Sequence, residues 1–491
     1  SVLPYGTSVK ALKPQIIHNG YSISPESGET QDFTNPVSYT VTAKDGTTAV
    51  YTVSVNVLSS TDMYNANLSI LKVKKGKLQP DFNPGNYPYL DAPIPFSDSA
   101  SPAYNDKQSN SLIADPEIQL AKITINGTPV ENGAEYVISN LAVGSNSVEI
   151  IVTSADGSNS NMYTVNMYRA IPIFKTGAGS YSGINPLEDG ATQRGVSWPS
   201  PRFKDNGNGT VTDLLTGLMW SQNDNLILSD FDSSVAAANN LILGGYDDWR
   251  LPNVLELTSL ISFNTTFQNY LSPFFSGITN TRKWWTSTIN NSNMGLFFTS
   301  SDSIIEAISP SSFYSTWAVR DINPVSPVFV LPKTKGKPRY SGDDGNLQKG
   351  VEWPDPRFYT EIPGAVVDNM TSLMWFPVYE VPSPSPGGDN WYPSINWIKE
   401  RINSGIRPNY GYSDWVLPNV NEIKTLANYS ASDINWLNPF ISIYIYPLWT
   451  STSKNNSFAF YFYPDNQLIN SDFKASYFNI LPVRQARIIN Y

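Results

Sequence analysis

Hydrophobic and polar residues alternate in two pairs of segments in the first third of the chain, and an Asp-Gly dipeptide joins the members of each pair. The pairs are residues 37–43 with 51–55 around Asp45-Gly46, and residues 148–153 with 163–167 around Asp156-Gly157. Alternation is typical of half-buried strands, and Asp-Gly between such runs favours a type I′ turn, whose two central residues both have positive φ. The pattern predicts two tandem β-sandwich domains, at residues 1–58 and 62–169.

The remainder of the chain contains an internal duplication, in which five motifs occur in the same order in both copies. The matching segments are residues 194–203 and 349–358, 216–220 and 371–375, 245–253 and 411–419, 285–288 and 449–452, and 319–320 and 483–484. We therefore expect two homologous domains, at residues 170–325 and 330–491, with a Pro-containing linker at 323–333.

Each copy is predicted to be α+β. Residues 232–241 and 395–402 have the pattern of short helices, and the apolar runs 296–298 and 458–462 are typical of buried strands. A further helix is expected in each copy, because an Asn is followed three residues later by a Glu, as in a capping box. These pairs are Asn253 with Glu256, and Asn419 with Glu422.

Composition narrows the classes of function. The chain has no Cys, which excludes disulfides and cysteine nucleophiles. It has one His, His18, which nearly excludes zinc sites and Ser-His-Asp catalysis. A formal net charge of −10 argues against nucleic acid as a partner, since phosphate neutralisation needs a basic surface. No run of 18 apolar residues occurs, so we expect no membrane insertion by this chain. Many aromatic and few charged residues favour a protein of the extracellular space or the bacterial outer surface.

The first two domains resemble known bacterial families. Residues 62–169 resemble the cadherin-like β-sandwich family, on residues 67–71, 76–78, 80–82 and 123–127 and on the closing hairpin. Residues 1–58 resemble immunoglobulin-like repeats in which a strand precedes a Pro-Tyr-Gly-Thr stretch, here residues 4–7. The chain begins almost on that stretch, so the first strand is expected to be missing. This would result either from trimming of the chain or from strand donation between the subunits of a polymer.

The duplicated domains resemble the Lcl C-terminal family, named for a Legionella collagen-like adhesin. The resemblance rests on the ordered motifs given above, beginning with Trp-Pro-x-Pro-Arg-Phe and ending with Val-Arg. It implies a C-type-lectin-like fold and adhesion to a ligand, which in some members is a glycosaminoglycan. The formylglycine-generating enzymes share the broader fold but depend on catalytic cysteines, which this chain lacks. We therefore expect no catalytic residues and no enzyme.

One loop of the first copy is a candidate calcium site, although we expect no cofactor to be required. Its oxygen-bearing side chains are spaced somewhat as in a calcium loop: Asp205, Asn206, Asn208 and Asp213. The glutamate of an EF-hand loop is missing, and the second copy keeps little of the stretch. The alternative is an Asn-Gly turn without metal.

Exposed loops that differ between the copies are the candidate ligand sites, because the shared scaffold does not dictate their residues. They are Arg282, Lys283 and Trp284 in the first copy, and Tyr444 and Tyr446 in the second. Basic and aromatic side chains together suit a sulfated sugar, although burial between the copies is an equal alternative. By contrast, the Asp-Trp pairs that both copies share, Asp248-Trp249 and Asp414-Trp415, are expected to be structural, with Trp packed and Asp bonded to Arg or to backbone amides.

The sequence thus predicts an exported, non-catalytic binding protein. We expect an adhesin that recognises a glycan or an extracellular matrix protein through its two C-terminal domains, carried on a β-sandwich stalk. The alternative is a structural subunit of a surface filament, which self-associates through its β-sandwich domains.

Overall fold

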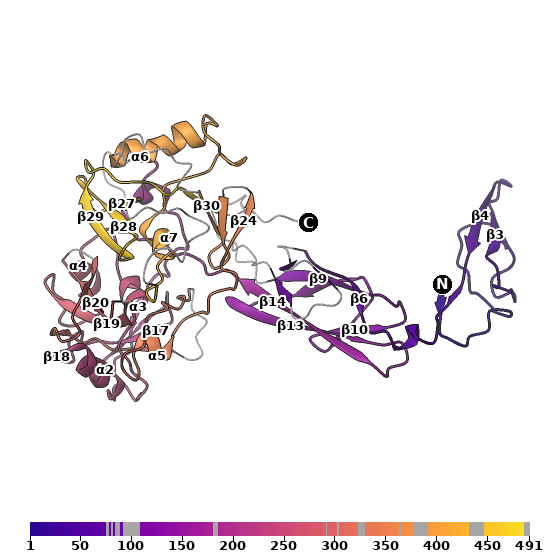
Figure 1. Ribbon diagram of the computed structural model, residues 1–491, viewed down its shortest axis with the longest axis horizontal. Coiled ribbons are helices and arrows are strands. Elements are labelled where there is room, and N and C mark those ends of the chain that lie inside the picture. Colours follow the sequence, from indigo (N-terminus) through magenta and orange to yellow (C-terminus); the bar gives the residue numbers. More distant parts are fainter. Residues whose placement is uncertain are drawn as a thin grey trace.

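The computed structural model describes residues 1–74, 78–79, 82–83, 89–91, 109–179, 185–290, 292–301, 304–322, 329–362, 365–376, 390–431 and 446–485. The chain is extended, with the N-terminal region at one end, a β-sandwich in the middle and the two copies of the duplicated domain at the other end (Figure 1).

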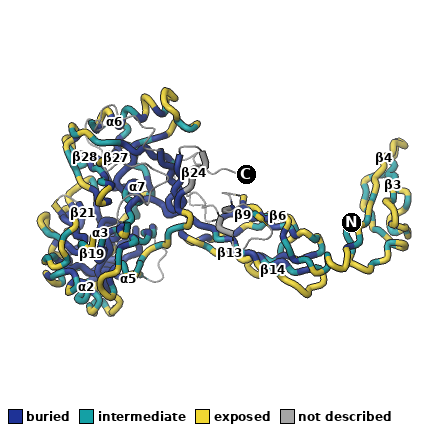
Figure 2. Tube along the Cα trace, in the orientation of Figure 1, coloured by how far each residue is buried: buried dark blue, intermediate teal, exposed yellow. Residues whose placement is uncertain are grey.

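The N-terminal region is a small, open β structure. Its strands are β1 (Val2–Leu3), β2 (Ser22–Ser24), β3 (Val37–Thr42), β4 (Thr48–Val53) and β5 (Asn56–Val57). One sheet has the order β2-β3-β4, and β1 pairs in parallel with β5. A short first strand is therefore present, where the sequence predicted that it is missing. Phe33, Tyr39 and Leu58 are buried, whereas β4 is exposed along most of its length (Figure 2).

The predicted β3–β4 hairpin is confirmed, but its turn is not of type I′. The strands pair from Val37 with Val53 to Thr42 with Thr48. At the turn Gly46 has a φ of +84°, while Asp45 keeps a negative φ. The Ala43 N–H donates to the Thr47 carbonyl and the Gly46 N–H to the Ala43 carbonyl, which makes a longer loop with one left-handed residue.

The second domain is a two-layer sandwich that follows a short 3₁₀ turn, η1 (Asp62–Tyr64). One sheet has the order β12-β9-β6 and the other β11-β10-β13-β14-β8-β7. Their bounds are β6 (Leu68–Val73), β7 (Leu78–Gln79), β8 (Tyr89–Asp91), β9 (Asn110–Pro116), β10 (Lys122–Ile125), β11 (Thr128–Val130), β12 (Glu135–Ile138), β13 (Gly144–Thr153) and β14 (Ser160–Arg169). The predicted closing hairpin is β13–β14, and apolar residues of both sheets form one core between the layers.

The first copy contains two sheets and three main helices. One sheet has the order β15-β16-β17-β23 and the other β18-β22-β19-β20-β21. The strands are β15 (Phe203–Asp205), β16 (Thr210–Asp213), β17 (Leu218–Ser221), β18 (Leu228–Ser229), β19 (Lys283–Ile289), β20 (Gly295–Thr299), β21 (Ile304–Ile308), β22 (Tyr314–Ser315) and β23 (Val319–Asp321). The helices are α2 (Phe231–Asn239), α3 (Val254–Ser259) and α4 (Phe267–Leu271).

The second copy repeats this plan with fewer described strands. Its sheets have the orders β24-β25-β26-β30 and β27-β28-β29. The strands are β24 (Phe358–Ile362), β25 (Ala365–Asp368), β26 (Leu373–Trp375), β27 (Leu448–Ser453), β28 (Phe458–Tyr463), β29 (Leu468–Phe473) and β30 (Val483–Gln485). The helical segments are α6 (Trp391–Trp397), the π-helical turn η3 (Ile398–Ile402) and α7 (Val420–Lys424). The predicted strands at 296–298 and 458–462 and both capping boxes are confirmed. The C-type-lectin-like assignment stays a prediction.

The two copies exchange the segments that precede them. The lead-in of the first copy carries α1 (Asp189–Thr192), which contacts β27 of the second copy; the lead-in of the second carries α5 (Asp344–Leu347), which contacts β19 of the first (Figure 1). The helix of each lead-in begins with a buried aspartate. Asp189 accepts hydrogen bonds from Thr176 at 2.5 Å and Thr452 at 2.8 Å, and Asp344 accepts from Thr334 and from Thr288, the latter at 2.7 Å.

A shared core joins the copies as well. One cluster of buried side chains includes Trp220 and Leu257 of the first copy together with Trp375 and Ile423 of the second. The outer strands β21 and β29 contact each other across the junction. The boundary expected between residues 325 and 330 therefore separates the copies along the sequence but does not separate them in space.

Candidate functional site

The motifs that both copies share build the scaffold. Asp248 Oδ1 lies 2.5 Å from Arg320 Nε, and the guanidinium sits 3.7 Å from the Tyr246 ring centroid. In the second copy Asp414, Arg484 and Tyr412 repeat this arrangement, with distances of 2.7 and 3.8 Å. The neighbouring Trp249 and Trp415 are buried and donate to backbone carbonyls. The structural role predicted for the shared Asp-Trp pairs is confirmed.

The capping-box glutamates are held by arginines from different places. In the first copy Glu256 forms a two-pronged pair with Arg250, at 2.6 Å for each contact. The second copy has Val416 at the position of Arg250, and Glu422 instead receives Arg194 from the first lead-in, at 2.5 and 3.1 Å. Burying a carboxylate without a cation costs free energy of folding. Arg194 therefore supplies the counter-charge of Glu422 that Val416 cannot provide.

The candidate calcium residues form a turn. Asp213 faces Arg202 at 2.8 and 3.0 Å, with both side chains buried. Asp205 accepts from the Gly207 N–H, Asn206 bonds the hydroxyls of Thr210 and Thr212, and Asn208 accepts from Thr210. Within the described ranges no group of three His, Cys, Asp or Glu side chains is placed to hold a metal. The four residues do not converge as one ligand set, because the ion pair and the turn use their oxygens.

The three ligand residues predicted in the first copy differ in their surroundings. Lys283 is exposed, Arg282 is held in an ion pair and Trp284 is buried. Lys283 is 41% exposed and lies 4.0 Å from Glu306, with its ammonium 4.9 Å from the Phe297 ring centroid. Arg282 pairs with the buried Asp224 at 2.7 Å. Trp284 has 0% exposure and donates to the Asp224 carbonyl, so its assignment as a ligand contact is wrong: β19 directs this indole into the core.

The residues predicted in the second copy are described in part. Tyr446 is exposed at the start of the strand region that leads into β27. Tyr444 lies outside the described residues. Of the predicted ligand residues, Lys283 and Tyr446 therefore lie at the surface. When the copies are aligned at an offset of 164, Tyr446 falls one position before Lys283.

A pair of aromatic rings in contact on the second copy is a surface feature that sequence reasoning missed. Phe458 begins β28 and Phe473 ends β29, and they are partners in the β28–β29 ladder. Their ring centroids are 4.2 Å apart with an interplanar angle of 35°, and Phe473 is 55% exposed. We call these two rings the aromatic platform. Of the two rings, Phe473 is the exposed one and Phe458 is partly buried.

Polar groups border the aromatic platform on one side. Asn455, Asn456 and Ser457 are exposed in the β27–β28 turn, and with Phe458 they line an open groove. Asn455 Oδ1 accepts from the N–H groups of Ser457 and Phe458, both at 2.9 Å, which fixes the turn beside the rings. The Lys474 N–H donates to the Ser457 carbonyl and its carbonyl accepts from Trp391, so α6 adjoins the platform and carries the exposed Tyr392.

A buried cation, Lys474, directly follows Phe473 in the sequence. The Lys474 side chain is 5% exposed, lies 3.9 Å from Glu188 and has its ammonium 4.1 Å from the Trp391 ring centroid. Burial lowers the pKa of Lys474, and Glu188 opposes this shift. The Lys474 cation is therefore enclosed by an aromatic ring and a carboxylate rather than presented to solvent. A second lysine, Lys454, lies beside the turn and donates to the Ser471 hydroxyl at 3.3 Å.

The difference between the copies is the signal that could have identified the platform. The β28–β29 register repeats that of β20–β21 at an offset of 164, which aligns Phe458 with Met294 and Phe473 with Ser309. Phe458 belongs to the apolar run 458–462, so its pattern alone indicates core, whereas Phe473 follows the polar residues 470–472. Comparing the copies position by position shows that the scaffold does not require them.

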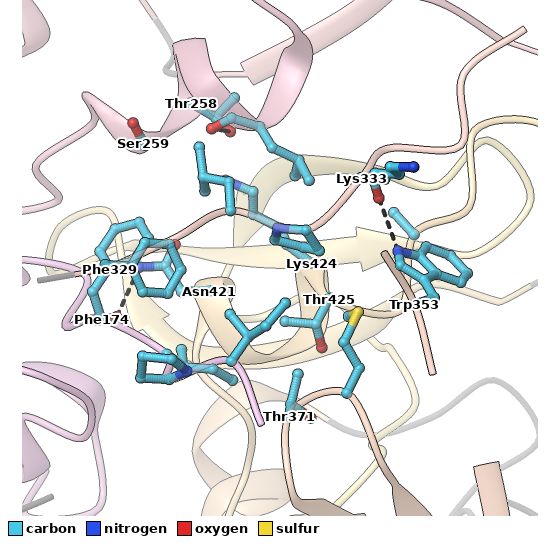
Figure 3. Close-up of a pocket in the computed structure, with 18 residues that line it drawn as sticks. Phe174, Thr258, Ser259, Phe329, Lys333, Trp353, Thr371, Asn421, Lys424 and Thr425 are labelled. Carbon is cyan, nitrogen blue, oxygen red and sulfur yellow. Dashed lines mark hydrogen bonds between the residues drawn. The ribbon is translucent and has the colours of Figure 1, made fainter. Parts of the chain in front are cut away.

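A cavity also lies between the copies, with residues of both lining it (Figure 3). Its volume of about 50 Å³ is too small for a sugar ring, since one water molecule alone occupies roughly 10–15 Å³ by this measure. Glycan binding therefore belongs to the surface rather than to this cavity. No described helix is long and apolar enough to cross a membrane.

Three family models match the chain. The Lcl C-terminal domain matches residues 209–320 and 364–484, the cadherin-like beta sandwich domain matches residues 97–170, and the SGBP N-terminal model matches residues 1–55. These matches confirm the predicted arrangement of two Lcl C-terminal domains behind a cadherin-like sandwich and one smaller N-terminal module. Comparison with curated proteins found no match.

Among solved structures, three similar chains illustrate how distant the likeness is. A putative glycoside hydrolase from Bacteroides thetaiotaomicron is 15% identical over 39% of this chain and 79% of its own, with a TM-score of 0.13. Fibronectin(III)-like modules of CbhA from Clostridium thermocellum are 13% identical over 27% and 60%, with a TM-score of 0.11. SGBP-B from Bacteroides ovatus, in complex with a mixed-linkage heptasaccharide, is 10% identical over 32% and 60%, with a TM-score of 0.10. At these TM-scores none of the three defines the fold or the ligand of this chain.

Proposed function

We propose that this chain is a non-catalytic glycan-binding protein of the bacterial surface. Its domain order supports the proposal, because an SGBP N-terminal region and a cadherin-like sandwich precede two Lcl C-terminal domains. The observation that carries this proposal is the aromatic platform, Phe458 and Phe473, beside the exposed amides of Asn455 and Asn456. Sugar rings have apolar C–H faces and hydroxyl edges. An exposed aromatic ring with amide donors and acceptors beside it complements both parts.

The charges around the platform favour a neutral polysaccharide over a sulfated one. Lys474 is enclosed, and Asp472 directly precedes Phe473 on β29. In the first copy the exposed Lys283 faces Glu306, so its charge is balanced as well. Recognition of a sulfated polyanion needs a positive surface, and residues 326–491, which contain the platform, carry 14 basic and 14 acidic side chains.

The extended arrangement suits presentation of the platform away from the N-terminal region. The sandwich lies between that region and the duplicated domains, whose second copy carries the platform (Figure 1). We propose that the sandwich acts as a spacer and that the fused copies act as the ligand-binding head.

The proposal is tested with the full chain on immobilised neutral polysaccharides, sulfated polysaccharides and matrix proteins. Phe473→Ser installs the residue of the first copy, and loss of one stacking ring should weaken binding about tenfold or more. Phe313→Ser is the matched control, because Phe313 is an exposed aromatic residue of the first copy. Unchanged binding by Phe473→Ser, or loss caused equally by the control, would contradict the proposal. Turnover of any polysaccharide would show that the protein is an enzyme and would also contradict the proposal.

A second candidate function, a subunit of a surface filament, is favoured by one observation. β4 is an edge strand in the order β2-β3-β4, and its Val50 and Tyr51 side chains are exposed. An open apolar edge can pair with a strand of another chain. Sedimentation of the native chain separates the two candidates. Growth into large assemblies that Val50→Lys abolishes would favour the filament, whereas a concentration-independent monomer would remove it.

A further inference from the structure

The sandwich is hydrogen-bonded directly to the second copy of the duplicated domain. The Tyr168 hydroxyl, near the end of β14, donates to the Glu352 carbonyl at 3.0 Å, and the Ile171 N–H donates to the Met370 carbonyl at 2.8 Å. Glu352 and Met370 belong to the second copy, although the lead-in that starts at residue 170 belongs to the first. The sandwich is therefore bonded to the copy that lies farther along the sequence.

Apolar packing closes the same joint. Val143, just before β13, packs against a buried cluster to which both lead-ins and both copies contribute: Ile171, Phe174, Leu215, Phe329 and Met370. The next residue, Gly144, has a φ of +95°, and a Cβ at this position would lie 2.6 Å from Val351 Cγ1. The backbone of the sandwich thus touches the second copy so closely that only glycine fits.

The residue that receives Tyr168 is itself held in place. The Glu352 carboxylate pairs with Lys333 and Lys335, which lie in the lead-in of the second copy. At an offset of 155 the position equivalent to Glu352 in the first copy is Ser197, which has no charge to pair. The anchoring point of the sandwich is therefore particular to the second copy.

The joint on the other side of the sandwich is built differently. Residues 59–61 are exposed, and the bonds of this connector are local: the Ser59 N–H donates to Asp62 Oδ2 at 2.9 Å, and the Asp62 N–H donates to Ser59 Oγ at 3.1 Å. The sandwich core includes no described residue of 1–58. The N-terminal region projects away from the far end of the sandwich (Figure 1). A short exposed connector between separate cores permits relative motion.

We propose that the chain has one hinge, at residues 59–62, and that the sandwich and both copies turn about it as one rigid body. Domains joined by a small polar interface move relative to each other, whereas a packed apolar interface suppresses that motion. The Gly144–Val351 contact, the buried cluster and the two hydrogen bonds supply such an interface on one side of the sandwich only. A pull on the sandwich is then transmitted directly to the second copy, through Tyr168 and Ile171.

This inference concerns the mechanics of the chain and does not rest on glycan binding. Distances between pairs of spin labels on the full chain, measured by double electron–electron resonance, test it. Because the chain has no Cys, two introduced cysteines are the only labelling sites. Glu149→Cys with Lys399→Cys spans the joint between the sandwich and the second copy, and Thr48→Cys with Glu149→Cys spans the connector. All three positions are exposed. We expect one narrow distance for the first pair and a distribution at least about twice as wide for the second.

A matched pair of variants identifies the contact that fixes the joint. Gly144→Ala introduces a Cβ against Val351, so it should widen the distribution between the sandwich and the second copy. Gly157→Ala in the β13–β14 turn is the control, because Gly157 has a φ of +78° and a Cβ there meets nothing within 4 Å. It adds similar backbone strain to the same domain without a clash, and the distance should stay narrow.

The wild-type distances alone can overturn the proposal. A wide distribution between the sandwich and the second copy would show that this joint bends, and a narrow one across the connector would show that residues 59–62 are not a hinge. Equal distributions in Gly144→Ala and Gly157→Ala would remove the Gly144–Val351 contact from the account. Since the labelled pairs carry only exposed substitutions, the test does not depend on the folding of either glycine variant.

Discussion

The two copies of the duplicated domain have the same scaffold and different surfaces. Positions that match between them hold the scaffold together: the capping boxes and the packed tryptophans are buried, and exposed Asp248 and Asp414 each pair with a buried arginine. Positions that differ include Ser309 and Phe473, which are both exposed. Identity between duplicated domains therefore marks what the fold needs, and divergence at exposed positions indicates where a function has room to develop.

Where the two copies differ at a buried position, another residue compensates for the change. In the second copy, Val416 occupies the position of Arg250, which pairs with Glu256 in the first copy. Glu422 pairs instead with Arg194 of the exchanged lead-in. The copies have thus become dependent on each other through their lead-ins. This dependence can be broken and rebuilt by mutation.

The largest effect is expected from Arg194→Ala. Glu422 would remain buried without its cation, so the free energy of unfolding should fall by about 3 kcal/mol. Denaturant unfolding measures this loss. Adding Val416→Arg should restore most of it, since the second copy would then hold its glutamate as the first does. A loss below about 1 kcal/mol, or failure of the double variant to recover, would contradict the account of the interlock.

A smaller effect is expected from the pH dependence of the exchanged aspartates. Burial raises the pKa of Asp344 to about 6 and also raises that of Asp189. Since the folded-state pKa of Asp344 lies above its unfolded value, the folded state binds more protons, and the free energy of unfolding rises as the pH falls from above 6 toward 4. We expect a gain of about 2 kcal/mol between pH 7.5 and 5, from unfolding curves at each pH.

Asp344→Asn serves as the control for that measurement. The amide does not titrate, so the rise in stability between neutral and mildly acidic pH should become shallower in this variant. A slope that is the same in both proteins would assign the pH dependence to other groups.

The smallest effect is expected from calcium. Asp213 is held by Arg202, and Asn206 by two threonines, so a chelator should change the stability of the chain by less than about 0.5 kcal/mol. Melting curves with and without chelator measure this. A large shift would restore the Asp205–Asp213 loop as a metal site that the second copy lacks.

Local rules sufficed for much of the fold. The strand alternation around Asp45-Gly46 and Asp156-Gly157, and the Asn-x-x-Glu capping boxes, depend on neighbours a few residues apart, so the sequence predicted them. The turn type was predicted wrongly because two-residue and longer loops use the same Asp-Gly signal. The exchange of α1 and α5 depends on contacts such as Asp189 with Thr452, which no local pattern encodes.

The site was harder to predict for the same reason. Lys283 and Trp284 are adjacent in sequence, and β19 sends the lysine outward and the indole inward. Phe458 and Phe473 are separated by a whole hairpin and meet through cross-strand register. Only the comparison of the copies, aligned by that register, distinguishes these two rings from ordinary core residues.

The most direct test of the central claim transplants the platform between the copies. A chain with Phe458→Met and Phe473→Ser carries the first copy's residues in the second, and one with Met294→Phe and Ser309→Phe carries the reverse. Calorimetric titration with the polysaccharide selected by the wild type should show binding weakened about a hundredfold in the first chain and a second, weaker site in the other. Undiminished binding by the chain without the platform would contradict the account.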